Sequence, residues 1–109
     1  MPWETVASWE QVAAAQQLQV KCAGHDILLI NTPNQLVAIA DRCTHAGFPL
    51  FGGCLQGDKI VCPIHGASFD IRTGKAVAPP AFKAINIYDV RVEQGYVQIF
   101  IDSDMRRDS

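Results

Sequence analysis

The sequence predicts an all-β protein, folded as an antiparallel β-sandwich or barrel. The chain has 109 residues, about the length of one domain, which predicts a single folded unit over residues 1–109. Hydrophobic residues make up 49% of the chain and charged residues 18%, so it can bury a core and is not expected to be disordered. Many short strand-like runs, separated by Gly and Pro turns and accompanied by one helical pattern, favour antiparallel sheets.

The first forty residues predict four strands and one helical turn. Ser8 followed by Gln11 has the pattern of a capping box, which predicts a short helix over residues 9–14. Residues 23–26 contain a glycine and separate two β-rich runs, so these runs are expected to form a hairpin. The strands expected in this part of the chain are 3–7, 18–22, 27–30 and 36–40.

The pattern changes between residues 41 and 75, where six glycines interrupt any long element. We expect this stretch to be mostly loop, with one short strand at 59–61 and a solvated turn at 72–75. Pro79-Pro80 marks a further loop. The strands expected after it are 85–92, with an irregularity near Tyr88 and Asp89, and 96–101.

The charge balance argues against a nucleic-acid partner. Nine Lys and Arg against eleven Asp and Glu leave a formal charge of −2, and no basic cluster exceeds Arg106-Arg107. Binding of nucleic acid requires cations that neutralise phosphates. No apolar run approaches the roughly 18 residues that cross a bilayer, and the first residues lack the basic and apolar segments of a secretory signal. We therefore expect a soluble, cytoplasmic protein without nucleic-acid or membrane partners.

Two short motifs combine cysteine with histidine. Cys43-Thr44-His45 and Cys62-Pro63-Ile64-His65 each lie in a loop rich in Gly or Pro, next to an expected strand. This spacing lets each loop offer a thiolate and an imidazole to the same centre. The two loops together supply a Cys₂His₂ set, which suits a tetrahedral Zn²⁺ or a two-iron cluster with two Cys on one iron and two His on the other.

Spacing alone leaves the kind of metal open. Zinc is the commoner metal for two Cys and two His, but zinc fingers and ribbons usually pair Cys with Cys and His with His in each half-site. Here each half-site is mixed, as a two-iron cluster requires if each loop reaches both irons. The remaining alternative is that these four residues hold no metal.

The paired motifs resemble those of a known family. Cys43-Thr44-His45-Ala46-Gly47 together with Cys62-Pro63-Ile64-His65-Gly66 is similar to the two-box signature of Rieske [2Fe-2S] proteins. The resemblance implies a [2Fe-2S] cofactor, with Cys43 and Cys62 on the buried iron and His45 and His65 on the outer iron. It also implies an antiparallel β base formed by residues 1–40 and 76–102, with a small inserted cluster-binding subdomain of two loops at about 41–75.

Two departures from the respiratory members of that family indicate the subgroup. Respiratory Rieske proteins carry an extra cysteine in each box, and the matching positions here are Phe48 and Ile64, so the disulfide between the boxes is absent. They also carry Ser and Tyr hydroxyls that donate to cluster sulfurs, where this chain has Ala67 and Phe69. Fewer such hydrogen bonds favour a potential near the low end of the Rieske range, about −150 mV rather than about +300 mV.

The chain thus resembles the small ferredoxins that serve bacterial oxygenases. The resemblance implies a one-electron carrier, without catalytic residues of its own. An NAD(P)H-dependent flavoprotein ferredoxin reductase would supply the electrons, and a terminal aromatic-ring-hydroxylating oxygenase would receive them. Two alternatives stay open: the small Rieske-like subunit of a nitrite reductase, and a zinc-binding interaction module.

The remaining two cysteines and one histidine receive simpler interpretations. Cys22 and Cys54 are expected to be buried, inert thiols, and His25 a surface residue in a hairpin turn. Residues 48–50, Ile64 and 77–80 lie near the motifs or resemble the proline loop that covers the cluster in this family. They either keep water from the sulfurs or form a small apolar docking patch.

Overall fold

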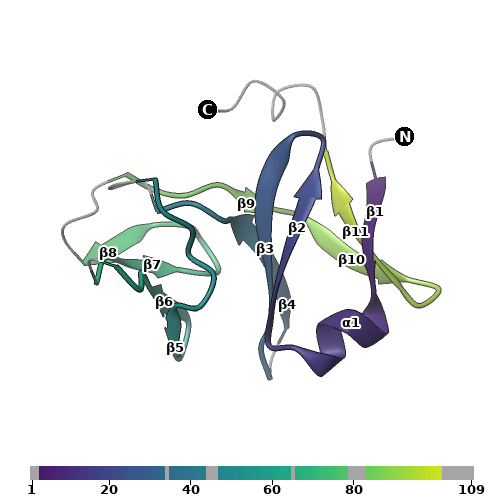
Figure 1. Cartoon of the computed structure of the whole chain (residues 1–109), viewed down its shortest axis with the longest axis horizontal. Helices are drawn as coiled ribbons and strands as arrows, with labels where there is room; N and C mark the ends of the chain where they lie inside the picture. The colour runs from purple at the N-terminus through teal and green to yellow at the C-terminus, as the bar shows by residue number, and fades with distance from the viewer. Residues whose placement is uncertain (1–2, 34, 44–46, 65, 79–82, 102–109) are drawn as a thin grey trace.

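The described part of the chain folds into three antiparallel sheets and one short helix, which confirms the predicted all-β class. The computed structural model describes residues 3–33, 35–43, 47–64, 66–78 and 83–101. Two of the sheets and the helix form one end of the molecule, and the third sheet, whose strands lie within residues 54–78, forms the other end (Figure 1). No helix within the described ranges has the length and apolar character that crossing a membrane requires.

The first sheet has the strand order β1-β11-β10 and brings together the two ends of the described chain. Its strands are β1 (Trp3–Ser8), β10 (Val90–Glu93) and β11 (Tyr96–Phe100). The helix α1 (Trp9–Ala14) follows β1 directly. The predicted capping box is confirmed, because the Ser8 hydroxyl accepts from the Gln11 backbone N–H at 3.2 Å and the Gln11 side chain accepts from the Ser8 N–H at 2.9 Å.

The second sheet has the order β2-β3-β4-β9 and contains the predicted hairpin. Its strands are β2 (Gln17–Cys22), β3 (His25–Asn31), β4 (Leu36–Ala40) and β9 (Ile87–Tyr88). The hairpin turn has two residues, Ala23 and Gly24, since Cys22 pairs with His25. The irregularity predicted near Tyr88 is also confirmed, because the strand is interrupted between β9 and β10.

The central strand β3 is buried on both faces, which explains its uninterrupted apolar run. Ile27 and Leu29 belong to the core shared with the first sheet, and Leu28 and Ile30 belong to a second core. All four side chains are fully buried. A strand that lies between two layers has no solvent face, and its sequence therefore lacks the usual polar alternation. The second core also contains Cys43 and Cys62.

The third sheet, of order β5-β6-β7-β8, corrects the expectation that residues 41–75 are mostly loop. Only β6 was expected there. The strands are β5 (Cys54–Gln56), β6 (Lys59–Val61), β7 (Ser68–Asp70) and β8 (Ala76–Ala78). Three residues are too few to display an alternating pattern, so these strands are specified by pairing and by buried side chains such as Ile60 and Phe69.

Candidate metal centre

The first cysteine of the candidate site begins a tight loop after β4. The Cys43 N–H donates to the carbonyl of Phe48, five residues further on, at 2.7 Å. The Gly47 N–H in turn donates to the Cys43 carbonyl at 2.7 Å. Gly47 has a positive φ of 78°, a conformation that a residue with a Cβ rarely adopts. These two hydrogen bonds fold the backbone back on itself around the cysteine.

The second cysteine, which directly follows β6, has the same backbone environment. The Cys62 N–H donates to the Ala67 carbonyl, again five residues on, at 2.7 Å, and the Gly66 N–H donates to the Cys62 carbonyl at 3.1 Å. Gly66 also has a φ of 78°. The two loops therefore present their cysteines from equivalent backbone positions, although they lie on different parts of the chain.

The same apolar core buries both cysteines. Cys43 is 0% exposed and Cys62 is 2% exposed, and their neighbours in that core include Leu50, Ile60 and Phe69. A thiolate in such surroundings is costly unless a cation compensates its charge. Two buried sulfur donors delivered by equivalent loops therefore fit a metal centre, and the [2Fe-2S] cluster is the group that the sequence motifs imply.

The other two predicted ligands, His45 and His65, lie outside the described residues. In the sequence they fall inside the two cysteine loops, at the second position after Cys43 and the third after Cys62. Across the described ranges, no group of three or more His, Cys, Asp and Glu side chains is arranged to hold a metal ion. The described part of the chain thus contributes the sulfur half of the candidate site.

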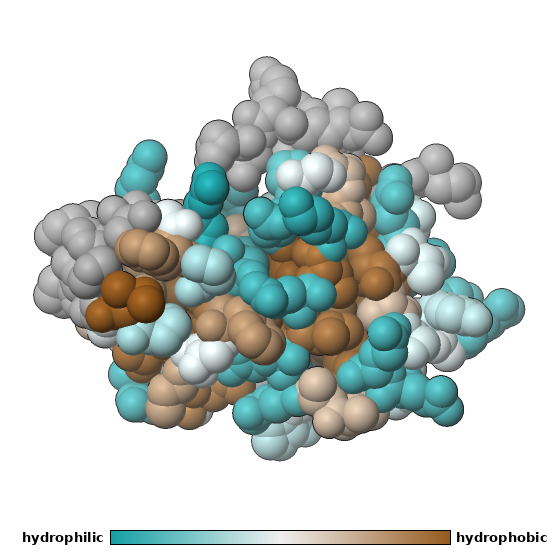
Figure 2. All heavy atoms as spheres, in the orientation of Figure 1, coloured by the Kyte–Doolittle hydropathy of each residue, from teal (hydrophilic) through white to brown (hydrophobic). Residues whose placement is uncertain are grey.

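Some hydrophobic side chains near these loops are buried, and others are exposed to solvent. Leu50 is fully buried, which agrees with a role in keeping water from the sulfurs, whereas Phe48, Ile64 and Val77 are exposed. Figure 2 shows apolar surface at the end of the molecule that carries β5 to β8. We call Phe48, Ile64 and Val77 the apolar rim. Pro79 and Pro80, which were expected to contribute to the same surface, lie outside the described residues.

A buried carboxylate, which the sequence analysis missed, supports the first loop. Asp41 is 6% exposed, and one of its carboxylate oxygens accepts from the backbone N–H groups of Leu50 at 2.8 Å and Phe51 at 2.9 Å. Its other oxygen accepts from the Gln19 side-chain amide at 2.7 Å. In the sequence, the sign of this role was an acidic residue between a strand and the first motif. It was not sufficient, because the groups that bind Asp41 lie on distant parts of the chain.

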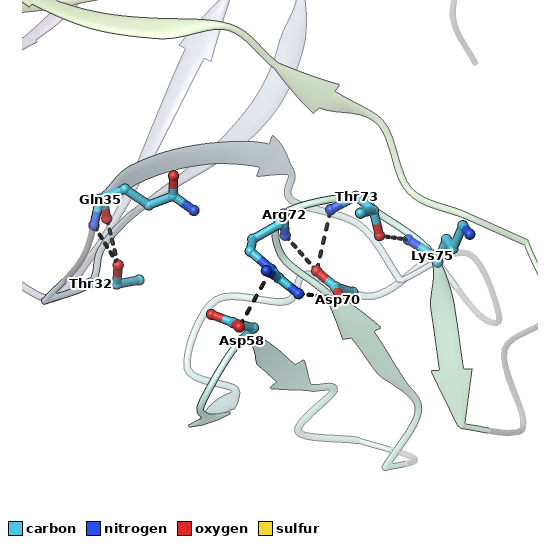
Figure 3. Close-up of polar contacts among 7 residues, drawn as sticks. All are labelled: Thr32, Gln35, Asp58, Asp70, Arg72, Thr73 and Lys75. Carbon is cyan, nitrogen blue, oxygen red and sulfur yellow. Dashed lines mark hydrogen bonds and ion pairs between the residues drawn. The ribbon is translucent and has the colours of Figure 1, made fainter.

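A second acidic residue orders the turn after β7. The Asp70 carboxylate accepts from the backbone N–H groups of Arg72 at 2.8 Å and Thr73 at 3.3 Å. The Arg72 guanidinium forms ion pairs with Asp70 at 3.6 Å and with Asp58 at 3.4 Å (Figure 3). The hydrogen bond from the Arg72 N–H, with further help from Thr73 and the guanidinium, holds the pKa of Asp70 below its ordinary value. Asp70 is thus ionised at neutral pH.

The two remaining cysteines differ from each other. Cys22 is buried as expected, and burial, assisted by the charge of Glu4, raises the pKa of its thiol, which favours the neutral form. Cys54 was expected to be buried as well, and this is wrong, because it is exposed. It begins the edge strand β5, where Leu55 rather than Cys54 packs against the core. Neither cysteine forms a disulfide.

The expectation that His25 lies at the surface is also wrong. His25 is 9% exposed, and its Nδ1 lies 3.4 Å from the Tyr88 hydroxyl, with the two rings packed edge to face. The hairpin turn consists only of Ala23 and Gly24, so His25 is the first residue of β3 and shares the inward face of Ile27. It belongs to the base of the fold rather than to the candidate site.

Fold and site together define a class of protein: a small antiparallel β-protein in which two loops with matching backbone hydrogen bonds each bury a cysteine. A family model described as the Rieske [2Fe-2S] domain matches residues 2–89. The chain therefore belongs to the Rieske [2Fe-2S] domain family. The cofactor of that family is the [2Fe-2S] cluster with mixed Cys and His ligation.

Similar proteins are components of dioxygenase systems. The biphenyl dioxygenase ferredoxin subunit of Pseudomonas sp. (strain KKS102) is 32% identical over 94 residues, which cover 85% of this chain and 86% of that protein. The 3-phenylpropionate/cinnamic acid dioxygenase ferredoxin subunit of Escherichia coli (strain K12) is 44% identical over 77 residues, which cover 70% and 71%. The chain is thus similar over most of its length to proteins named as ferredoxins.

A solved structure with the same fold comes from a complex. It is the complex of reduced oxygenase and oxidized ferredoxin in carbazole 1,9a-dioxygenase. The matching chain superposes with a TM-score of 0.80 at 28% identity, and the match covers 91% of this chain and 93% of that chain. The fold is therefore shared over nearly the full length of both chains.

Proposed function

We propose that this protein is a one-electron carrier that holds a Rieske-type [2Fe-2S] cluster through Cys43, His45, Cys62 and His65. The single observation that supports this most strongly is the equivalent burial of Cys43 and Cys62, whose backbones make matching hydrogen bonds. His45 and His65 would complete the set, since each is the histidine of its motif. The cluster-binding subdomain would then consist of the loops and the β strands around them, inserted into the base.

The comparisons support one end of the proposed electron path, the delivery of electrons to an oxygenase. Relatives named ferredoxin subunits of biphenyl and phenylpropionate dioxygenases, and a matching chain in an oxygenase–ferredoxin complex, support delivery of electrons to a terminal oxygenase that hydroxylates an aromatic ring. An NAD(P)H-dependent flavoprotein reductase is the proposed donor, because a one-electron carrier needs a partner that divides the electron pair of a hydride. The protein itself would bind no organic substrate and would act in the cytoplasm.

The proposed potential is at the low end of the Rieske range. When bound, the cluster accepts and releases a single electron. Two ferric ions, two sulfides and two thiolates with neutral imidazoles have no net charge, and reduction adds one negative charge. Hydrogen-bond donors to the sulfurs would stabilise the reduced form. Ala67 and Phe69 are fully buried but have no hydroxyl, so neither side chain supplies such a donor.

The proposed docking surface is the apolar rim. Its three side chains are exposed next to the cysteine loops or on β8. Electron-transfer encounters bury little area and dissociate quickly, so a small apolar surface is sufficient. The Leu50 side chain, which is fully buried, would exclude water from the sulfurs rather than contribute to this docking surface.

Spectroscopy and reconstitution test this proposal together. The purified protein should be red-brown and contain two irons and two acid-labile sulfides, with the EPR spectrum of mixed His/Cys ligation after reduction. It should be reduced by an NAD(P)H-dependent ferredoxin reductase and reoxidised by a terminal aromatic-ring oxygenase. A colourless protein with stoichiometric zinc would contradict the cofactor. Electron transfer to a sirohaem nitrite reductase instead of an oxygenase would contradict the proposed partner.

A further inference from the structure

The strongest feature outside the ligand set is the buried carboxylate of Asp41. It accepts three hydrogen bonds, two from the backbone N–H groups of Leu50 and Phe51 and one from the Gln19 amide, at 2.7 to 2.9 Å. All three donors are neutral groups. None of the ion pairs among the described residues includes Asp41. The carboxylate is thus well hydrogen-bonded, but these donors do not neutralise its negative charge.

Asp41 joins the beginning and the end of the loop that contains Cys43, which we call the first ligand loop. It precedes Cys43 by two residues, so their Cα atoms are at most about 7 Å apart. Leu50 and Phe51 directly follow the same loop, and their N–H groups therefore tie the end of the loop to its beginning. Gln19 connects this closure to the base of the fold, because it lies on β2.

The same strand anchors the next part of the chain. The Gln17 side chain accepts from the Gly52 N–H at 2.8 Å and donates to the Gly53 carbonyl at 2.9 Å. Gln17 and Gln19 occupy alternate positions of β2, so their side chains point to the same side of the strand. Gln17 and Gln19 therefore hold the segment around the first loop to the base of the fold at two points. These contacts also fix the position of Asp41.

We propose that Asp41 is a positioning residue of the first ligand loop and that its fixed negative charge lowers the reduction potential of the centre held by Cys43 and Cys62. This inference depends on the proposed cofactor. Reduction adds one negative charge to the centre, and a nearby carboxylate that water cannot screen disfavours that step. An exposed carboxylate has a much smaller effect, because water and salt screen it.

Three variants separate charge from position. Asp41→Asn removes the charge, while its carbonyl oxygen still accepts from the Leu50 and Phe51 N–H groups. Gln19→Lys keeps Asp41 and its two backbone hydrogen bonds but adds a cation next to the carboxylate. The matched control is Asp26→Asn, which changes net charge by the same amount. Its side chain is 59% exposed, and its backbone carbonyl accepts from the Asp41 N–H, so it is near in space but solvated.

The readout is the potential, measured by EPR-monitored redox titration of each holoprotein. Asp41→Asn and Gln19→Lys should each raise the equilibrium constant for reduction at least threefold, whereas Asp26→Asn should change it less than twofold. Tenfold corresponds to about 59 mV for one electron. Should Asp41→Asn and Gln19→Lys both behave like Asp26→Asn, the electrostatic role is rejected. If Asp41→Asn does not retain the cluster, Gln19→Lys decides the point.

Iron release tests the positioning role. Asp41→Ala removes the acceptor as well as the charge, so a chelator should extract its iron at least threefold faster than that of Asp41→Asn. Equal rates would reject the positioning role. A wild-type protein without a two-iron cluster would instead contradict the proposed function, so the two failures are distinguishable.

Discussion

Cys43 and Cys62 occupy equivalent backbone positions: each N–H donates at 2.7 Å to the carbonyl five residues further along the chain. The two motifs differ in the sequence distance from Cys to His, but both have a glycine four residues after the cysteine. The shared spacing is therefore that between cysteine and glycine. It explains how two motifs with different histidine positions share the same backbone hydrogen bonds at their cysteines and the same φ at their glycines.

Replacing either buried cysteine should abolish the cluster. We expect Cys43→Ser and Cys62→Ser proteins to be colourless and to contain little iron or acid-labile sulfide, because each would lack a thiolate ligand. Cys54→Ser is the matched control. Because Cys54 is exposed, its replacement should leave the absorbance unchanged. Loss of the cluster in Cys54→Ser but not in Cys43→Ser would refute the proposed ligands.

Adding a hydroxyl near the sulfurs should raise the potential. Phe69→Tyr introduces a donor at a fully buried position. If its hydroxyl stabilises the reduced cluster over the oxidised one by about 1 kcal/mol, the potential rises by about 40 mV. Phe69→Leu, which changes packing without adding a donor, controls for indirect effects. A redox titration that gives the same potential for Tyr and wild type would disprove the explanation based on missing hydroxyls.

A charge on the apolar rim should slow electron transfer without affecting the cluster. In Phe48→Glu, docking would bury an unpaired carboxylate, and we expect the rate constant for reduction of the oxygenase to fall about tenfold, or about 1.4 kcal/mol. The visible spectrum should not change. Val92→Glu is the control, because Val92 on β10 is 46% exposed and Phe48 is 45% exposed. Equal rates in the two variants would argue against this docking surface.

Removing the Asp70 carboxylate should destabilise the fold at neutral pH. Asp70→Ala leaves the Arg72 and Thr73 N–H groups without their acceptor, so we expect the free energy of unfolding to fall by about 1–2 kcal/mol. The folded-state pKa of Asp70 lies below the ordinary value of 3.8. Its stabilisation is therefore present above pH 3.8 and is lost as the pH falls through the folded-state pKa.

Urea unfolding followed by circular dichroism measures this effect. The difference between wild type and Asp70→Ala should be largest at pH 7 and should shrink below pH 3.8. Asp26→Ala controls for the loss of an exposed aspartate, whose ion pair with Lys21 is solvated on both sides. A difference that does not depend on pH would show that the carboxylate charge is not the source of the stability.

Local patterns were sufficient to predict much of the base of the fold. The capping box of Ser8 and Gln11 predicted α1, and two β-rich runs around a glycine predicted the β2–β3 hairpin, because such signals depend on residues close together in the sequence. The short strands β5, β7 and β8 were missed. Each has only three residues, too few to show an alternating pattern. Pairing with neighbouring strands, which the sequence does not reveal locally, stabilises them.

The sequence by itself determined the chemistry that this protein can offer, because the thiol and imidazole groups available to a metal follow from residue type and motif spacing. Only the tertiary structure decided which of those groups are enclosed. It buries Cys43, Cys62 and His25 and exposes Cys54; the motifs had distinguished Cys43 and Cys62, but local sequence did not separate the exposed Cys54 from the buried Cys22 or place His25 in the interior. Enclosure depends on which distant strands pack over a side chain, and the hydrogen bonds of Asp41 to residues far along the chain arise in the same way.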